Sequence, residues 1–355
     1  MAGKKMVFIY VGKNSNGIAY KTPTDTQLKK FSKATEIVLC TGNTTIYMTS
    51  STERAALASQ IADMTYQIKN AIGKKVWIPT PMINSELASL TEANNAAATI
   101  LAFMNTVKTS INARFGSTTA FNTNVIGVYV NKEHITNRVD STNPIHNLDP
   151  ASLTSMKKHP DVSLFTQIRT AATSMALQTL WCPYFGHGSN YAPTINDIGY
   201  VANLHTIFDY VYLQPHYYFL KSPDIFKNFG AIRKSCATNR VHDRDLVPVG
   251  SQKGSTTKIG VQMELDRYWY SGNRTSGGAQ DAATNAELKY RNTLYEKCIK
   301  NEAIAAKSPD HGALPILSGY SKADTNISYY LDSMYSASDE AWYNALSALV
   351  DSYFA

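Results

Sequence analysis

Charged residues are sparse in this sequence: they make up 17% of 355 residues, and the net charge is +7. Hydrophobic residues reach 44% and aromatic residues 11%, so long disordered segments are not expected. The lysines occur as scattered pairs rather than as a block, which argues against a nucleic-acid-binding protein. No window approaches the roughly 18 apolar residues that a membrane-spanning helix requires, so we expect no membrane span.

Cysteine is scarce as well. Cys40, Cys182, Cys236 and Cys298 lie far apart and form no CxxC or Cys/His cluster, so neither a zinc site nor a disulfide framework is expected. Cys40 and Cys182 lie in apolar runs and are predicted to be buried thiols. The histidines lack the spacing of a metal-binding helix, and we predict no metal and no cofactor. The apolar run Met6–Val11 is too short for a signal peptide.

Short apolar runs alternate with helical patterns along the chain. The runs predicted as strands are Met6–Gly12, Glu36–Thr41, Lys75–Thr80, Val125–Val130, Leu180–Phe185, Tyr210–Gln214, Lys258–Leu265 and Leu314–Leu317. The segments predicted as helices are Ser51–Ile72, Thr91–Phe115, Leu164–Leu177, Thr194–Asn203, Ser222–Cys236 and Ala282–Ala306, followed by two C-terminal helices near Thr325–Met334 and Ser338–Tyr353. Extended loops are expected after the fourth, fifth and seventh strands.

Eight strands that alternate with helices predict an α/β protein, a (β/α)8 TIM barrel formed by a single domain over residues 1–355. Nearly continuous apolar strands are typical of a parallel sheet covered on both sides. A doubly wound open sheet is the alternative. It requires a glycine-rich turn after the first strand, and the segment Gly12–Gly17 lacks the GxGxxG spacing.

Active sites of such barrels lie at the carboxyl ends of the strands. Glu133 follows the predicted fourth strand and Glu264 lies at the end of the seventh, on roughly opposite sides of the ring. Two carboxylates across a cleft are what cleavage of a glycosidic bond requires, one as proton donor and one as nucleophile or stabiliser. Side chains alternate between the two faces of a strand, so Gln262, Glu264 and Asp266 of the seventh strand point to one side. Asp266 is therefore the substitute candidate for the acid/base role.

Polar and aromatic residues at the other strand ends are candidates for sugar binding. Aromatic faces pack on sugar rings, and Asn, Gln and His side chains hydrogen-bond hydroxyl groups. The candidates are Asn131, Tyr184, His187, Gln214, His216, Tyr217, Asp266 and Trp269. Structural interpretations stay open: Glu264 as the partner of a barrel Lys or Arg, Glu133 as a solvated loop carboxylate, and residues 214–218 as a satisfied glutamine among packed tyrosines.

Four stretches resemble a bacterial family catalogued as domain of unknown function 4855: Gly127–Ile135, Leu180–Gly186, Phe208–Phe219 and Gly260–Asp266. The resemblance implies a TIM barrel similar to glycoside hydrolases, usually on secreted or cell-surface proteins. It also implies likeness to the larger clan that carries its acid/base after the fourth strand and its nucleophile after the seventh. That clan has Asn directly before Glu, whereas Lys132 stands between Asn131 and Glu133 here.

We therefore predict a glycoside hydrolase that acts on a polysaccharide or oligosaccharide with retention, with Glu264 as nucleophile and Glu133 as acid/base. The alternative is a catalytically inactive carbohydrate-binding or structural barrel of a bacterial surface or an assembled particle. A lyase or aldolase would need a lysine inside the barrel, and the two candidates, Lys13 and Lys132, are predicted in loops.

Overall fold

The computed structural model describes the chain except for residues 1–2, 15, 43, 84–85, 136–147, 150, 187–190, 251–253, 271, 278–279, 307–311, 319, 321–324, 333–343, 346, 350 and 352–355. The strands are β1 (Lys5–Val11), β2 (Glu36–Thr41), β3 (Val76–Pro79), β4 (Val125–Val130), β5 (Gln178–Trp181), β6 (Tyr210–Leu213), β7 (Lys258–Asp266) and β8 (Asn326–Asp332). The helices are α1 (Asp25–Lys29), α2 (Ile46–Thr49), α3 (Ser51–Ile72), α4 (Leu90–Phe115), α5 (Ala120–Asn124), α6 (Leu153–Met156), α7 (Pro160–Ser174), α8 (Tyr191–Asn203), α9 (Pro223–Thr238), the short 3-10 helix η2 (Arg267–Trp269) and α10 (Asn285–Ile299).

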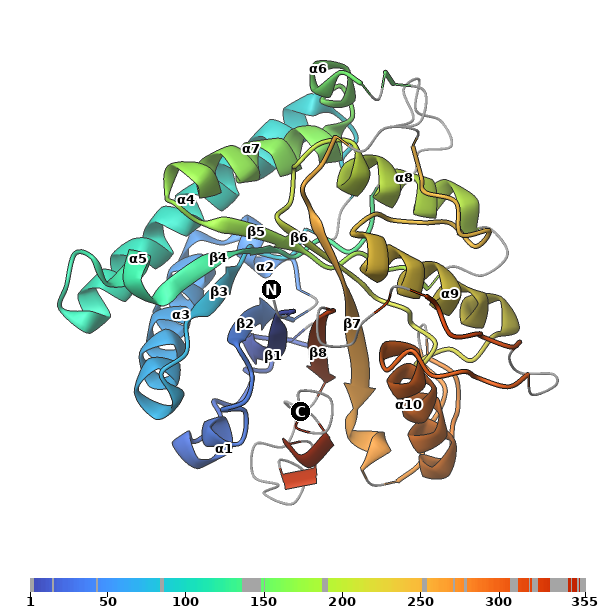
Figure 1. Ribbon diagram of the computed structural model, residues 1–355. Coiled ribbons are helices and arrows are strands. Elements are labelled where there is room, and N and C mark those ends of the chain that lie inside the picture. Colours follow the sequence, from blue (N-terminus) through green and yellow to red (C-terminus); the bar gives the residue numbers. More distant parts are fainter. Residues whose placement is uncertain are drawn as a thin grey trace.

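These strands close into a parallel barrel in chain order, with β8 hydrogen-bonded to both β7 and β1. Figure 1 shows the helices outside this ring, with α3, α4 and α7 on one side and α8, α9 and α10 on the other. Closure leaves each strand with a neighbour on both sides, which removes exposed sheet edges. The predicted (β/α)8 TIM barrel is confirmed, and the open doubly wound sheet is excluded.

The two longest helices begin and end at residues with clear local signals. In α3 the Ser50 side chain accepts the Glu53 amide, and Gly73 ends the helix at φ +68°. In α4 the Ser89 side chain caps the first turn and Gly116 ends the helix at φ +64°. Side-chain caps and glycines in the left-handed conformation satisfy backbone groups that a helix end leaves open. These signals explain why the predicted bounds of both helices agree with the structure within one residue.

Large side chains fill the inside of the barrel. Phe8 of β1 meets Tyr129 of β4 edge to face at 5.2 Å, and Trp77 of β3 meets Tyr210 of β6 at 5.9 Å. Contacts between strands that are not neighbours place these rings in the barrel interior. Such a barrel is a packed core rather than a pore, so chemistry is confined to the rim where the strands end.

The prediction for the eighth strand was wrong. The segment Leu314–Leu317 forms no barrel strand, and Leu314 instead makes an isolated antiparallel bridge with Ile304 after α10. The barrel strand is β8, in the region predicted as the first C-terminal helix near Thr325–Met334. Pairing along both β7 and β1 overrides the local helical pattern there, and the Asn326 side chain accepts the Lys4 amide at 2.9 Å. The described positions between 344 and 351 are helical, within the second predicted tail helix.

The four cysteines are buried free thiols, as predicted for Cys40 and Cys182. None of the described helices has the length and apolar character to cross a membrane.

Candidate functional site

Sheet hydrogen bonding continues past the ends of β4, β5 and β6 and aligns three predicted site residues. The Tyr184 amide donates to the Glu133 carbonyl at 2.9 Å. Tyr184 also forms a parallel bridge with Gln214, where the Phe185 amide donates to the Gln214 carbonyl at 2.8 Å. Glu133, Tyr184 and Gln214 therefore lie side by side at the carboxyl-end rim of the barrel.

Glu264 lies in β7 and is buried, with 3% of its surface exposed. The Tyr295 hydroxyl, on α10, donates to its Oε2 at 2.7 Å. The other oxygen, Oε1, lies 3.5 Å from Nδ1 of His216. Each carboxyl oxygen of Glu264 thus has a defined neighbour.

Glu133 lies in a different electrostatic environment. Burial raises the pKa of its carboxyl, and the negative charge of Glu264 raises it further, while the Gln214 hydrogen bond and the nearby His216 lower it. The Gln214 amide nitrogen lies 3.5 Å from Glu133 Oε1 and donates to the Cys182 carbonyl at 2.8 Å. A carboxyl with a raised pKa beside a second carboxylate can stay protonated where the second is ionised.

The charges of both carboxylates act on Tyr184. Burial together with the charges of Glu264 and Glu133 raises the pKa of its phenol to about 12. Its ring meets His216 at 4.7 Å and His134 at 5.2 Å, and His216 in turn meets Phe219 at 5.4 Å. A row of rings therefore runs along the rim from β4 to the segment after β6, beside both acidic groups.

Asn131 lies lower in the rim, between β2 and β4. Its amide nitrogen donates to the Thr41 hydroxyl at 2.8 Å, and its backbone N–H donates to the Thr80 hydroxyl at 3.0 Å. Only 4% of its surface is exposed. Asn131 thus connects β4 with the ends of β2 and β3.

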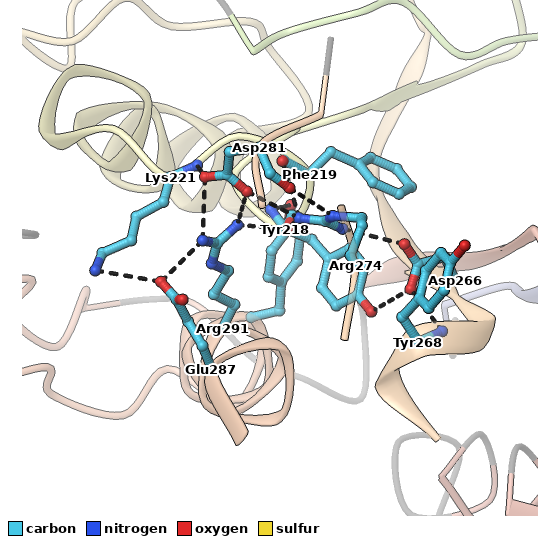
Figure 2. A network of polar contacts seen from close by, with 10 residues as sticks. Tyr218, Phe219, Lys221, Asp266, Tyr268, Arg274, Asp281, Glu287 and Arg291 are labelled. Carbon is cyan, nitrogen blue, oxygen red and sulfur yellow. Dashed lines mark hydrogen bonds and ion pairs between the residues drawn. The ribbon is translucent and has the colours of Figure 1, made fainter. Parts of the chain in front are cut away.

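The side chains of Asp266 and Tyr217 contact buried neighbours. Asp266 Oδ1 accepts from the Tyr218 hydroxyl and the Tyr268 amide, and Oδ2 accepts from Arg274, as Figure 2 shows. The Tyr217 ring, 1% exposed, packs edge to face on Phe226 and Phe229 of α9. Both side chains are almost fully buried in this structure, and their role in sugar binding stays a prediction.

Trp269 and His187 complete the predicted set. Trp269 is half-buried in η2, directly beyond Asp266, and its carbonyl accepts from the Asn285 side chain at 2.7 Å. His187 lies outside the described residues.

Tyr295 is the site residue that sequence reasoning missed. It comes from α10, far from the strand ends that the barrel rule examines. The buried positions of α10 include Leu288, Arg291, Tyr295 and Ile299, a spacing of three and four that places Tyr295 on the helix face toward the barrel. That periodicity was the available signal, but it does not identify a carboxylate partner.

The lysines that an aldolase or lyase would need are engaged in ion pairs. Lys13 Nζ bonds both carboxyl oxygens of Glu53 at 2.8 and 2.9 Å, and Lys132 Nζ lies 3.5 Å from Asp161. Among the residues that the structure describes, no group of three His, Cys, Asp or Glu side chains could hold a metal ion.

Comparison with solved structures relates this chain to barrel enzymes at low sequence identity. A Bacteroides thetaiotaomicron VPI-5482 protein assigned as an alpha-L-fucosidase matches with a TM-score of 0.51 and 11% identity, over 99% of this chain and 94% of that one. A glycoside hydrolase family 5 enzyme from Prevotella bryantii B14 matches with a TM-score of 0.46 and 10% identity, over 99% and 96%. A GH18 chitinase from Pseudoalteromonas aurantia matches with a TM-score of 0.42 and 13% identity, over 98% and 100%.

No protein-family model and no curated protein matches the chain. The resemblance to the domain of unknown function 4855 therefore stays a prediction. What the comparison shows is the fold, a TIM barrel of the kind found in glycoside hydrolases.

Proposed function

We propose that this protein is a glycoside hydrolase that cleaves a polysaccharide or oligosaccharide with Glu133 and Glu264. The observation that carries the proposal is the pairing of two unequal carboxyl groups at the carboxyl-end rim of the barrel. One has a raised pKa and feels the charge of the other, which receives a tyrosine hydrogen bond. The fold shared with glycoside hydrolase barrels is compatible with this assignment but does not carry it.

Glu133 is the proposed acid/base. Its carboxyl proton would pass to the glycosidic oxygen as the bond to the anomeric carbon breaks, so that the leaving group departs as an alcohol. The raised pKa keeps the proton in place until that step. In the second half of the reaction the Glu133 carboxylate would accept a proton from the attacking water.

Glu264 is the proposed nucleophile. Its carboxylate would attack the anomeric carbon and form an ester bond, which water then hydrolyses with net retention. The ester removes the negative charge beside Glu133, which lowers the pKa of Glu133 and suits its change from acid to base. Tyr184, His216, Gln214 and Trp269 are proposed to bind the sugar beside this pair.

The direct test is sugar release from a panel of polysaccharides by the wild type and by Glu264→Gln and Glu133→Gln. We expect a loss of at least about 10²-fold in each variant. Glu36→Gln is the matched control, because Glu36 lies at the start of β2 and bonds Lys4 and Trp77 away from the carboxyl-end rim. Sugar release that persists unchanged in Glu264→Gln would remove Glu264 from the mechanism.

A catalytically inactive carbohydrate-binding barrel is the second candidate. The ring row from His134 through Tyr184 and His216 to Phe219 is the observation that favours binding, because aromatic faces contact sugars whether or not cleavage follows. Retention of an intact polysaccharide by the wild type, without any release of sugar, would support this second function.

A further inference from the structure

His216 holds a backbone conformation that costs free energy. Its φ is +60°, a left-handed region that residues with a Cβ adopt uncommonly. Its Cβ also approaches Gly186 so closely that a Cβ on Gly186 would lie 2.2 Å away. Such strain persists only where the surroundings over-determine the conformation. Something must therefore hold the segment of residues 216–219.

Two buried arginines hold that segment, as Figure 2 shows. Nη2 of Arg274 donates to the carbonyls of Tyr218 and Phe219, both at 3.0 Å. Nη1 of Arg291 donates to the same Tyr218 carbonyl at 3.0 Å. The side chain of Arg274 is 1% exposed and is fixed in turn by Asp266 at 3.1 Å and by Asp281 at 3.0 Å. The loop after β7 and helix α10 thus clamp the segment after β6.

The clamped segment reaches Glu264 by two routes. The Tyr218 amide donates to the Tyr295 hydroxyl oxygen at 3.0 Å, and that hydroxyl donates its own proton to Glu264 at 2.7 Å. Because the phenol oxygen accepts from Tyr218, its proton is directed at the carboxylate. The His216 imidazole contacts the other oxygen of Glu264 at 3.5 Å.

We propose that Arg274 is a positioning residue for Glu264: by holding the Tyr218 and Phe219 carbonyls, it keeps His216 in the left-handed conformation with its imidazole against Glu264. The catalytic consequence rests on the proposed function, whereas the structural effect does not. Arginine suits this position because its planar fork of five donors serves acceptors in several directions. The Lys ammonium is a compact group that cannot reach all of them at once.

The test compares Arg274→Lys with Arg233→Lys as a matched control. Arg233 is also 1% exposed, and it bonds the carbonyls of Lys297, Cys298, Glu302 and Pro315 rather than the 216–219 segment. We expect Arg274→Lys to shift the ring resonances of His216 in NMR spectra and to lower kcat about tenfold with little change in KM. Arg233→Lys is expected to lower the melting temperature without moving the His216 resonances.

A double-mutant cycle separates positioning from general destabilisation. In a His216→Ala background, where the strained imidazole is gone, Arg274→Lys should lower kcat by less than the tenfold loss expected in the wild type, because only the route through Tyr295 remains. Fully additive losses would overturn the proposal, as would unchanged His216 resonances in Arg274→Lys. If Arg274→Lys does not fold, Asp281→Asn weakens the same clamp and should give the same shift.

The two proposals fail in different ways. If no polysaccharide is cleaved but the His216 resonances respond to Arg274→Lys, the positioning role stands and the hydrolase proposal fails. If cleavage is present and neither kcat nor the resonances respond, the positioning role fails alone.

Discussion

The surroundings of Glu133 make the stability of the fold depend on pH. Burial and the charge of Glu264 raise the pKa of its carboxyl. Between the ordinary pKa and the raised one, the native state binds a proton that the unfolded chain has lost, so stability falls as pH rises through that interval. Ionised Glu133 is therefore a destabilising group at neutral pH.

Replacement of Glu133 by Gln should remove that penalty. We expect Glu133→Gln to be more stable than the wild type near pH 8, with the difference vanishing near pH 4, where both chains carry a neutral side chain. Urea unfolding at the two pH values measures the change. Glu53→Gln, which removes the partner of Lys13, should give no such gain. A Glu133→Gln chain that loses stability increasingly with pH would contradict the raised pKa.

Tyr295 should influence catalysis through a single hydrogen bond. Tyr295→Phe keeps the ring and removes the hydroxyl that donates to Glu264 at 2.7 Å. Hydrogen bonds to charged groups contribute about 1.5–3 kcal/mol, so we expect kcat to fall about 10–100-fold. Tyr66→Phe, on α3 and packed on Phe115, is the control and should leave kcat unchanged. Equal activity in Tyr295→Phe and the wild type would show that this bond does not assist Glu264.

At the scale of elements, β7 is shaped by a glycine beneath the site. A Cβ on Gly260 would lie 2.2 Å from the Tyr212 ring and 2.6 Å from the Asn326 carbonyl oxygen of β8. Gly260→Ala should therefore destabilise the fold by about 1–3 kcal/mol through overpacking. Among the residues that the structure describes, none lies within 4 Å of a Cβ built on Gly277, so Gly277→Ala is a matched control that should change stability little. Thermal unfolding of the two variants measures this difference in stability. Equal melting temperatures for both variants would refute the packing argument.

The strands that could be predicted were those whose apolar, β-branched pattern agrees with their environment. Glu36–Thr41 and Val125–Val130 are predicted with the observed bounds of β2 and β4. In contrast, β8 has the sequence NISYYLD and begins with a polar residue. The short apolar run at Leu314 has the stronger local strand pattern. Its position is decided by long-range pairing with β1 and β7, which no local window contains.

At the scale of the whole molecule, barrel topology predicted much of the candidate site. The rule that chemistry lies at the carboxyl ends of strands selected Glu133, Tyr184 and Gln214, and the extended sheet hydrogen bonds place these three together. The same rule also selected Tyr217, which is 1% exposed, because the rule does not say how a side chain is oriented beyond a strand end. It could not find Tyr295, which reaches the rim from an outer helix.

In the proposed mechanism, Glu264 attacks the sugar while Glu133 serves as the acid/base. The most direct measurement is peptide mass spectrometry after incubation with activated 2-deoxy-2-fluoro glycosides, which slow hydrolysis of the covalent intermediate. The sugars tested would be those released from the polysaccharide panel. We predict one trapped glycosyl group, attached to Glu264. A label on any other residue, or sugar release that continues at the wild-type rate in Glu264→Gln with no label, would contradict the account.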